Sequence, residues 1–519
     1  MKIKKLLGCF LSLGLLVSPL TVCAEEQTDS VAYKKDNTQF ATVEEAWNAV
    51  CDGYEVYMNQ DWNTSSRLIL KEGSQAILHM NGHSINRQLS DYESNGEVIY
   101  MEKNSSLTVT GNTDRSFTTP NYKDDENGSI MANITLGGII TGGKSNNGAG
   151  GIHMKEGCTL TLNHVGVVGN KTWLLDACGG GIQMDGDQCT VNLNNGSMVS
   201  YNYSNGSGGG IYVAGENGII NMNDSEVSYN KATYGGGIYS NYDATYMYLE
   251  NYSSIHHNQA FSHGGGVRIT NSYSTILSDD GTGEISDNLL KGTKGCSGGG
   301  IFYAAVMTKK NVATLKGITF KNNEASVDYE GKGGAFYSRL DNIKVENCTF
   351  TKNIAQKGGA AFLEADDIEF KNCTITDNTC TGNGGAIYVD SMNDMCVSGK
   401  TTIKNNKNSN GEANDVYLEN GTFTRAYVKG TPDEGSEIGL MGDGDCKVGI
   451  NQTSNNGTFF LDDQSNYHLE YSDNKLYQKN GATGSIFGSG NMMIACIVLV
   501  CIVGVSGIVF YRKKKSKVK

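Results

Sequence analysis

Carboxylates and histidines are the side chains in this chain that could cleave a polysaccharide or hold a metal ion. Enzymes that cut glycosidic bonds use paired carboxylates as acid and base. The acids nearest the repeated glycines fall at unequal positions, which argues against a stack: Asp185, Asp187, Asp243, Asp366, Asp367 and Asp390. We interpret two other groups as solvated loop residues: Asp279-Asp280, and His256, His257 and His263. We therefore expect no catalytic residue, no metal and no cofactor.

Aromatic residues offer a different chemistry, the stacking of rings on a ligand. One position, directly after the apolar residue of a repeated glycine phrase, is aromatic in seven of ten copies: His153, Gln183, Tyr212, Tyr239, Arg268, Phe302, Tyr337, Phe362, Tyr388 and Tyr417. Its neighbours on both sides are mostly apolar, so strand alternation predicts that this position faces outward. Exposed rings would stack on sugars or anchor a protein. The alternative is that rings on neighbouring coils stabilise each other.

The seven aromatic members of that position are the candidate ligand-binding residues: Tyr212, Tyr239, Phe302, Tyr337, Phe362, Tyr388 and Tyr417. Their regular spacing comes from a repeated Gly-Gly-apolar phrase. Its apolar residues follow one another at intervals of 25–35: Ile152, Ile182, Ile211, Ile238, Val267, Ile301, Phe336, Ala361 and Ile387, with Val416 as a glycine-free last copy. The glycines permit positive φ and close approach at a tight corner.

A second phrase, a short β-rich run that ends in asparagine, keeps the same period. Its asparagines are Asn202, Asn230, Asn258, Asn288, Asn323, Asn353 and Asn378, with Asn170 and Asn406 at the two ends. Asparagine tolerates the left-handed region and can hydrogen-bond to the coil above or below. We predict a structural ladder of stacked amides rather than a chemical site. Two motifs with one period indicate a repeat architecture.

The segments between the motifs alternate with period two, as in Thr159–Leu162 and Thr190–Leu193, and are too short for helices. They predict an all-β fold, a right-handed parallel β-helix of the pectin-lyase-like kind, with about three strands in each coil. Thr42 and Glu45 fit a capping box. The apolar residues Val43, Ala46, Trp47 and Val50 then form one stripe of a short helix, which we expect to cap the first coil.

The two ends of the chain indicate secretion and a membrane anchor. Residues 1–24 combine basic residues, an apolar run and a small-residue cleavage site, as in a signal peptide. Met492 to Phe510 is long and apolar enough for one membrane helix, and the basic residues after it predict a cytoplasmic C-terminus. The remaining divisions are 25–135 (cap helix and first coils), 136–430 (repeat β-helix), 431–480 (C-terminal β cap), 481–491 (linker) and 511–519 (basic tail).

The charge balance limits the classes of partner that the chain can bind. Nine of the 42 basic residues lie in the first and last segments, which leaves 33 basic against 55 acidic side chains outside the membrane, a balance of −22. Such a surface excludes nucleic acid as a partner.

Two cysteine pairs occupy matching positions of neighbouring coils, Cys158 with Cys189 and Cys348 with Cys373. Stacked disulfides and buried free thiols are equally open for them.

The paired phrases resemble the FxxN and GGA[ILV] repeats of the chlamydial polymorphic outer-membrane proteins and related adhesin-like β-helix proteins. Phe320 to Asn323 leads to Gly333-Gly334-Ala335-Phe336, and Gly384 to Ile387 gives the second phrase in full. The resemblance covers roughly residues 136–430. It implies a cell-surface protein that acts as an adhesin or binding scaffold, with a carbohydrate or a surface protein of a host or neighbouring cell as partner. The alternatives are a β-helix polysaccharide lyase or glycoside hydrolase, and a purely structural envelope protein.

Overall fold

The structure is a computed structural model that describes residues 30–480, apart from 119–121, 125–127, 131–132, 243, 271–273, 293–294, 305–311, 327–328, 420–426, 443–445, 451–457, 462–466 and 473–474. The predicted signal peptide (1–24), linker (481–491), membrane helix (492–510) and basic tail (511–519) lie outside these residues and stay predictions. In the part of the chain that is described, no helix has the length and apolar character needed to cross a membrane.

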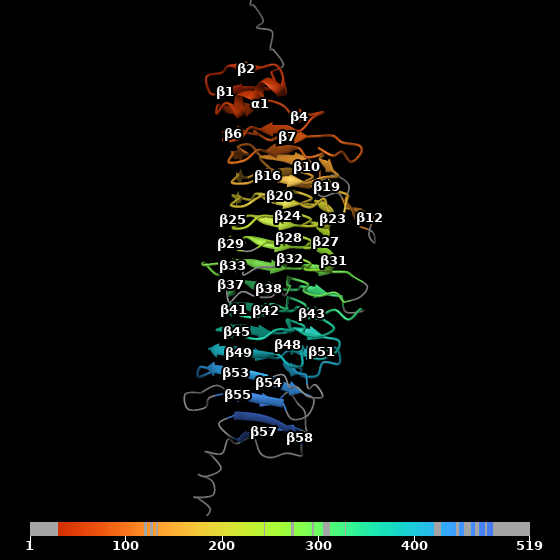
Figure 1. The fold of residues 1–519 in the computed structure, drawn as a ribbon, viewed down its shortest axis with the longest axis vertical. Coiled ribbons are helices and arrows are strands. Elements are labelled where there is room, and N and C mark those ends of the chain that lie inside the picture. The colour runs from red at the N-terminus through yellow and green to blue at the C-terminus, as the bar shows by residue number, and fades with distance from the viewer. Residues whose placement is uncertain are drawn as a thin grey trace, which may run out of the picture.

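Short strands wind into a right-handed parallel β-solenoid of about 11 turns, stacked along the long axis of the molecule (Figure 1). This confirms the predicted all-β solenoid. The first coils contain three strands, as the sequence predicts, but each coil between residues 106 and 418 contains four. The additional strand is a pair or short run of residues directly after the repeated asparagine, such as Lys171–Thr172. It is only two to five residues long and polar in most coils, so period-two alternation could not identify it.

The first coil is covered by a small cap, as the sequence predicts. Strands β1 (Ala32–Lys34) and β2 (Gln39–Phe40) pair with each other in antiparallel fashion. Helix α1 (Val43–Cys51) begins at a capping box in which the Thr42 hydroxyl accepts from the Glu45 backbone N–H at 3.2 Å and Glu45 accepts from Thr42 N–H. Ala46, Trp47 and Val50 of the predicted stripe are buried.

The ladder that follows each glycine-phrase strand is called ladder A here. Its strands pair in parallel, each with the next, except the early β3 that also meets β1 in antiparallel fashion. They are β3 (Glu55–Met58), β6 (Gln75–His79), β9 (Ser106–Thr110), β17 (Thr159–Asn163), β21 (Thr190–Asn194), β25 (Ile219–Asn223), β29 (Tyr246–Glu250), β33 (Thr275–Leu277), β37 (Ala313–Lys316), β41 (Ile343–Glu346), β45 (Ile368–Lys371), β49 (Asp394–Gly399), β53 (Tyr427–Pro432) and β55 (Cys446–Ile450).

The glycine phrases lead into a second ladder, the glycine ladder. It runs through β5 (Leu68–Leu70), β8 (Ile99–Met101), β16 (Ile152–Lys155), β20 (Ile182–Asp185), β24 (Ile211–Val213), β28 (Ile238–Ser240), β32 (Val267–Ile269), β36 (Ile301–Tyr303), β40 (Phe336–Ser338), β44 (Ala361–Leu363), β48 (Ile387–Val389) and β52 (Val416–Leu418). Its register aligns the phrases residue for residue, because Ile182 pairs with Ile211 and Gln183 with Tyr212.

The strands before the repeated asparagines form a third ladder, the corner ladder. It contains β4 (Trp62–Asn63), β7 (His83–Asn86), β14 (Gly138–Thr141), β18 (Gly166–Val168), β22 (Met198–Ser200), β26 (Glu226–Ser228), β30 (Ser254–His256), β34 (Glu284–Ser286), β38 (Thr319–Lys321), β42 (Thr349–Thr351), β46 (Thr374–Thr376) and β50 (Thr402–Lys404). Ladder A, the glycine ladder and the corner ladder enclose one continuous core of Ile, Val, Leu, Met and Phe side chains.

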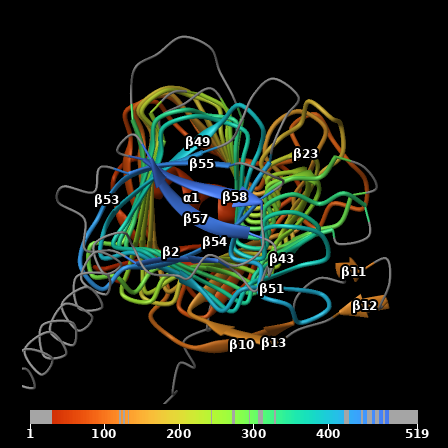
Figure 2. The same cartoon turned by 90° about the horizontal axis from the view of Figure 1, so that it is seen from below.

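The fourth ladder lies outside that core and forms what we call the lobe. Its strands are β15 (Lys144–Ser145), β19 (Lys171–Thr172), β23 (Tyr203–Ser207), β27 (Lys231–Tyr234), β31 (Gln259–His263), β35 (Leu289–Leu290), β39 (Glu324–Ala325), β43 (Ile354–Ala355), β47 (Thr379–Cys380) and β51 (Lys407–Asn408). Viewed along the long axis, β23, β43 and β51 lie to one side of the main body (Figure 2). The lobe has a small core of its own, which includes Ala260, Leu290 and Cys296.

Two hairpins and a closing sheet complete the chain. After β9 the chain leaves the solenoid in two antiparallel pairs: β10 (Arg115–Thr118) with β13 (Asn133–Leu136), and β11 (Tyr122–Asp124) with β12 (Gly128–Ile130). At the C-terminal end, β54 (Glu437–Gly442) joins the corner and glycine ladders and pairs with β56 (Thr458–Leu461). The antiparallel strands β57 (Tyr467–Ser472) and β58 (Lys475–Asn480) then follow, with β58 antiparallel to β55.

Candidate functional site

The repeated asparagines form a buried ladder of side-chain amides. In each coil the amide oxygen accepts from the backbone N–H and the Nδ2 of the preceding asparagine, as Asn230 Oδ1 does from Asn202 at 3.0 Å for both. The Asn202 Nδ2 also donates to the Val167 carbonyl one coil back. The pattern repeats along the whole predicted set: Asn202, Asn230, Asn258, Asn288, Asn323, Asn353 and Asn378.

Both ends of the ladder are closed by other groups. The Asn170 oxygen accepts from the Gly143 backbone N–H at 3.0 Å at one end. At the other end Asn406 donates through its backbone N–H and its Nδ2 to the buried carboxylate of Asp415, at 2.9 and 2.7 Å. Because every amide in the column is buried and hydrogen-bonded, these residues support the fold and offer no group to a ligand.

The left-handed backbone at this corner belongs to the residue before each asparagine, not to the asparagine itself. Tyr201, Tyr229 and Lys352 all have φ near 55°. The sequence-based expectation that asparagine takes this conformation is therefore wrong, because the asparagine must point inward to reach the next coil. From Gly179 to Gly384 the first glycine of the phrase does have positive φ, as predicted, for example Gly208 at +63° and Gly333 at +67°.

The position that follows each apolar residue of the glycine phrase forms a straight column on the side of the glycine ladder away from the main core. We call it the outward column. Its first five members, His153, Gln183, Tyr212, Tyr239 and Arg268, are the polar half. Its last five, Phe302, Tyr337, Phe362, Tyr388 and Tyr417, are the ring half. Strand alternation thus predicted the direction of these side chains correctly.

The predicted exposure of the aromatic rings is wrong. Tyr212 is half-buried, Tyr239 is 9 % exposed, and Phe302, Tyr337, Phe362, Tyr388 and Tyr417 are at most 5 % exposed and pack as a cluster with Met441. The rings stack from coil to coil, with centroids 5.1 Å apart for Phe302 and Tyr337 and 4.8 Å for Phe362 and Tyr388. The ring half therefore has no exposed aromatic strip. Its rings stack on those of neighbouring coils, which is the alternative that the sequence left open.

The ring half is covered by the segments that lead from the lobe into the glycine corners. The Lys332 ammonium lies 4.5 Å from the centre of the Phe362 ring, and the Lys357 ammonium lies 4.7 Å from that of Tyr388. Lys332 and Lys357 pair with each other through a parallel bridge, so their stems form a row over the rings. The rings were predicted to be exposed because the lobe strand was not recognised from the sequence.

Three carboxylates stack beside the ring half, two residues after the column position in successive coils. They are Glu364, Asp390 and Glu419, and their backbones continue the glycine ladder. Burial and the neighbouring Glu419 raise the pKa of Asp390 to about 6, and the hydrogen bond from Asp390 lowers the pKa of Glu419. Tyr388 and Lys357 extend the network, because Lys357 Nζ donates to the Tyr388 hydroxyl at 3.2 Å.

The sequence reasoning missed this stack, because Glu419 follows the glycine-free last phrase. The signal was a carboxylate two residues after Phe362, Tyr388 and Tyr417. The hydrogen-bonded Asp390 and Glu419 are closer than the roughly 5–5.5 Å or 6.5–9.5 Å that separate the carboxyl groups of retaining and inverting glycosidases. Of the other acids considered, Asp366 accepts from the backbone of Asp394 in an outer turn, and Asp243 lies outside the described residues.

The polar half has polar or charged side chains at three of its five positions, His153, Gln183 and Arg268. At its N-terminal end His153 contacts Asp185 at 3.0 Å, and Lys155 pairs with the same carboxylate. Burial raises the pKa of Asp185, but these two contacts outweigh it and hold the pKa below its usual value. At its other end Arg268 lies over the rings of Tyr234 and Tyr239, with its guanidinium carbon 4.2 and 5.1 Å from their centres.

The three grouped histidines have different surroundings. His256 contacts the Glu226 carboxylate at 2.9 Å and the Nδ1 of His257 at 2.8 Å. His263 instead lies beside the outward column and stacks on Phe302, with ring centres 4.4 Å apart. Within the described ranges no group of three or more His, Cys, Asp or Glu side chains is arranged to hold a metal ion.

The stacked cysteines are free thiols. Cys158, Cys189, Cys348 and Cys373 are all buried. Each thiol donates to a backbone carbonyl, for example Cys189 to Lys155 at 3.1 Å and Cys373 to Val345 at 3.2 Å. Burial raises the pKa of Cys189 and of Cys348 to about 12. Of the two alternatives left open by the sequence, the structure contains the buried thiols.

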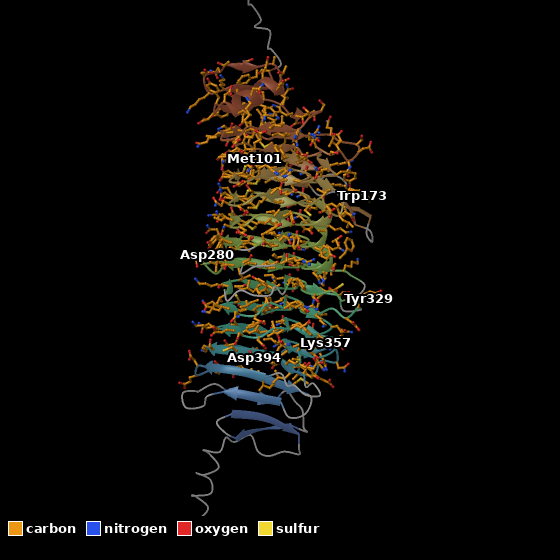
Figure 3. The ribbon with its side chains drawn as sticks, in the orientation of Figure 1. Met101, Trp173, Asp280, Tyr329, Lys357 and Asp394 are labelled. Carbon is orange, nitrogen blue, oxygen red and sulfur yellow. The ribbon has the colours of Figure 1, made fainter. Side chains whose placement is uncertain are left out.

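The outer face of ladder A contains an open hollow of about 340 Å³. It is lined by Val312, Asn342, Lys344, Asp367, Glu369 and Cys396. Exposed residues also project from both sides of the molecule, with Trp173 and Tyr329 on the side of the lobe and Asp280 on the opposite side (Figure 3).

The fold and the ladders define a parallel β-helix repeat protein. Two segments, residues 317–339 and 372–390, match the Chlamydia polymorphic membrane protein (Chlamydia_PMP) repeat. Each match runs from a corner strand through an asparagine of the ladder to a glycine phrase and its ring. The chain is therefore a β-helix repeat protein whose repeats are similar to those of the polymorphic membrane proteins. A comparison with curated proteins finds no match.

Proposed function

We propose that this chain is a bacterial surface protein that acts as an adhesin-like binding scaffold. Its partner would be a carbohydrate or a surface protein of a host or neighbouring cell, bound along the outer side of the glycine ladder. The repeat shared with a family of bacterial membrane proteins supports the surface location. The predicted signal peptide and the predicted helix at Met492 to Phe510 belong to the same proposal, with the ectodomain outside the cell and the C-terminus inside.

One observation supports a binding role above the others. The glycine ladder holds the outward column in register over ten coils, yet the column changes from His153 and Gln183 through Tyr212 to Arg268 before it becomes a ring stack. The frame repeats while these side chains vary. A solenoid offers such a column as an extended surface for a partner, and the structural needs of the fold do not require a different residue in every coil.

The binding proposal is tested with the full-length chain, purified in detergent and applied to glycan arrays, cell-wall fragments and host cells. We expect saturable binding that falls at least tenfold in Tyr212→Ser, because Tyr212 is the half-buried ring of the polar half. The matched control is Tyr246→Ser, a ring that is 38 % exposed on the outer face of ladder A. Equal loss in both variants, or no binding to any of these targets, would contradict the proposal.

The same preparation separates the alternatives. Cleavage products from a pectin, uronate and host-glycan panel would favour an enzyme, and the absence of both cleavage and binding would favour a purely structural envelope protein.

Surface location is tested separately on intact cells. External protease should digest the ectodomain, and the C-terminal tail should stay protected unless the cells are lysed.

A further inference from the structure

Arg268 is a cation with aromatic neighbours and, among the described residues, no carboxylate paired with it. Its guanidinium carbon lies 4.2 Å from the ring centre of Tyr234, 5.1 Å from that of Tyr239 and 5.5 Å from that of Phe302. No ion pair with Arg268 is found among the described residues. Its guanidinium hydrogen-bonds to the Tyr234 side chain, and its Nε is buried without a hydrogen-bond partner. Burial lowers the pKa of its guanidinium. Desolvating a charge without an opposite charge beside it destabilises a fold, so an arginine held only by aromatic side chains calls for a role.

A second nitrogen without a partner lies against the same rings. His263 stacks on Phe302 and lies 6.3 Å from the ring centre of Tyr234, and its Nδ1 is buried without a hydrogen-bond partner. Burial, Arg268 and Arg339 lower the pKa of His263 to about 4, so the imidazole is neutral at neutral pH. In the tautomer with a proton on Nδ1, this histidine and the Nε of Arg268 each offer an N–H donor that no oxygen of the described residues accepts.

The rest of the polar half continues the same feature over neighbouring coils. Tyr212 is half-buried and lies 5.4 Å from the ring centre of Tyr239. Gln183, one coil further, has a buried Oε1 without a partner. Gln183, Tyr212, Tyr239 and Arg268 occupy four successive coils, which spans roughly 14 Å at the usual strand spacing. That length accommodates two or three sugar rings.

We infer that the polar half binds the anionic group of an acidic oligosaccharide, with the carboxylate or sulfate on Arg268 and a sugar ring beside Tyr212. This inference rests on the proposed binding function and names its ligand class. Planar guanidinium donors suit carboxylate and sulfate oxygens. The chain as a whole is acidic, so a general positive field does not attract polyanions, and recognition depends on this one arginine.

The test uses the full-length chain in detergent with three hexasaccharide probes: oligogalacturonate for the carboxylate, a heparin fragment for the sulfate, and a neutral cello-oligosaccharide. We expect binding of at least one acidic probe and none of the neutral one. Arg268→Met should weaken that binding at least tenfold. The matched control is Arg339→Met, because Arg339 lies on the same side but already pairs with Glu364 at 3.4 Å, and its change should stay within twofold.

A second measurement uses the unaltered protein, so its result does not depend on whether Arg268→Met folds. Dicarbonyl labelling followed by mass spectrometry should modify Arg268 in the free protein, and the bound acidic probe should protect it. Unchanged affinity in Arg268→Met, equal loss in both arginine variants, absent protection, or no binding of either acidic probe would each overturn the inference. Binding of other glycans or of cells with unchanged Arg268→Met affinity would overturn the inference and leave the scaffold proposal standing. The failure of all binding would remove both.

Discussion

The two halves of the outward column have the same backbone and opposite chemistry. In the ring half, Phe302 to Tyr417 are stacked and buried, and lysine side chains lie over Phe362 and Tyr388. In the polar half, Gln183 and Arg268 carry buried polar atoms without partners. The register of the glycine ladder is the same in both. The difference shows that the coil fixes where the column points, whereas the covering segments decide whether a position becomes core or a site.

The largest expected difference between the halves concerns stability. Phe362→Ala should lower the free energy of unfolding by about 3–5 kcal/mol, because it leaves a cavity between Tyr337 and Tyr388. Tyr212→Ala in the polar half should lower it by about 1–2 kcal/mol, because that ring is half-buried. Urea denaturation of the two variants measures both. Equal losses would show that the two halves pack alike.

A change in the asparagine ladder should not distinguish the halves. Asn353→Ala leaves the backbone N–H and Nδ2 of Asn323 without their acceptor, and it should cost about 3 kcal/mol. Asn202→Ala, beside the polar half, should cost the same because Asn170 loses the same two bonds. The same denaturation experiment tests this. A clear difference between these variants would mean that the frame itself differs along the solenoid.

Acid should stabilise the ring half through Asp390. Its pKa is raised to about 6 in the folded protein, so the folded state holds this proton more tightly than the unfolded chain does. The free energy of unfolding should therefore rise slightly as the pH falls from about 7 towards about 4. In Asp390→Asn this contribution is absent, and unfolding midpoints measured across this range should rise less or fall more than in the parent protein.

Acid should weaken the polar half through His263, with an effect of similar small size. The pKa of His263 is lowered to about 4, so the unfolded chain binds this proton more tightly. Its contribution to stability is present above the unfolded pKa of about 6.5 and is lost as the pH falls towards 4. His263→Gln should remove this loss. If the variant and the parent lose the same stability between these pH values, the histidine is not buried as described.

Most of the solenoid could be predicted from the sequence, but little of the candidate site could. The period of the asparagines and glycines predicts the solenoid, because the same short motif recurs from coil to coil. The pattern from Thr42 to Val50 predicts the cap helix, because the capping box and the apolar stripe both lie within this short segment. The burial of Tyr388 could not be predicted, because the lobe segments that cover it are polar and irregular. The Asp390–Glu419 pair was missed because its second member follows a phrase without glycine.

Arg268 was visible in the sequence as an exception in an aromatic column. Whether it has an ion pair depends on the side chains that are brought near it, and those come from segments more than one coil apart, such as Tyr234 and Phe302. Spacing identifies the position of a residue in a solenoid. It does not identify what lies across from it, because the loops between coils differ in length.

The amide ladder has a direction, and this makes each coil an interchangeable unit. Every asparagine between Asn170 and Asn406 accepts from the coil before it and donates to the coil after it. A gene duplication that inserts one whole coil between them would therefore restore the same bonds at both new junctions. Asp415 cannot pass the pattern on, because a carboxylate accepts and has no N–H to donate. The chain can lengthen or shorten by whole coils while this single aspartate ends the asparagine ladder, beyond which β53 and β54 continue the solenoid.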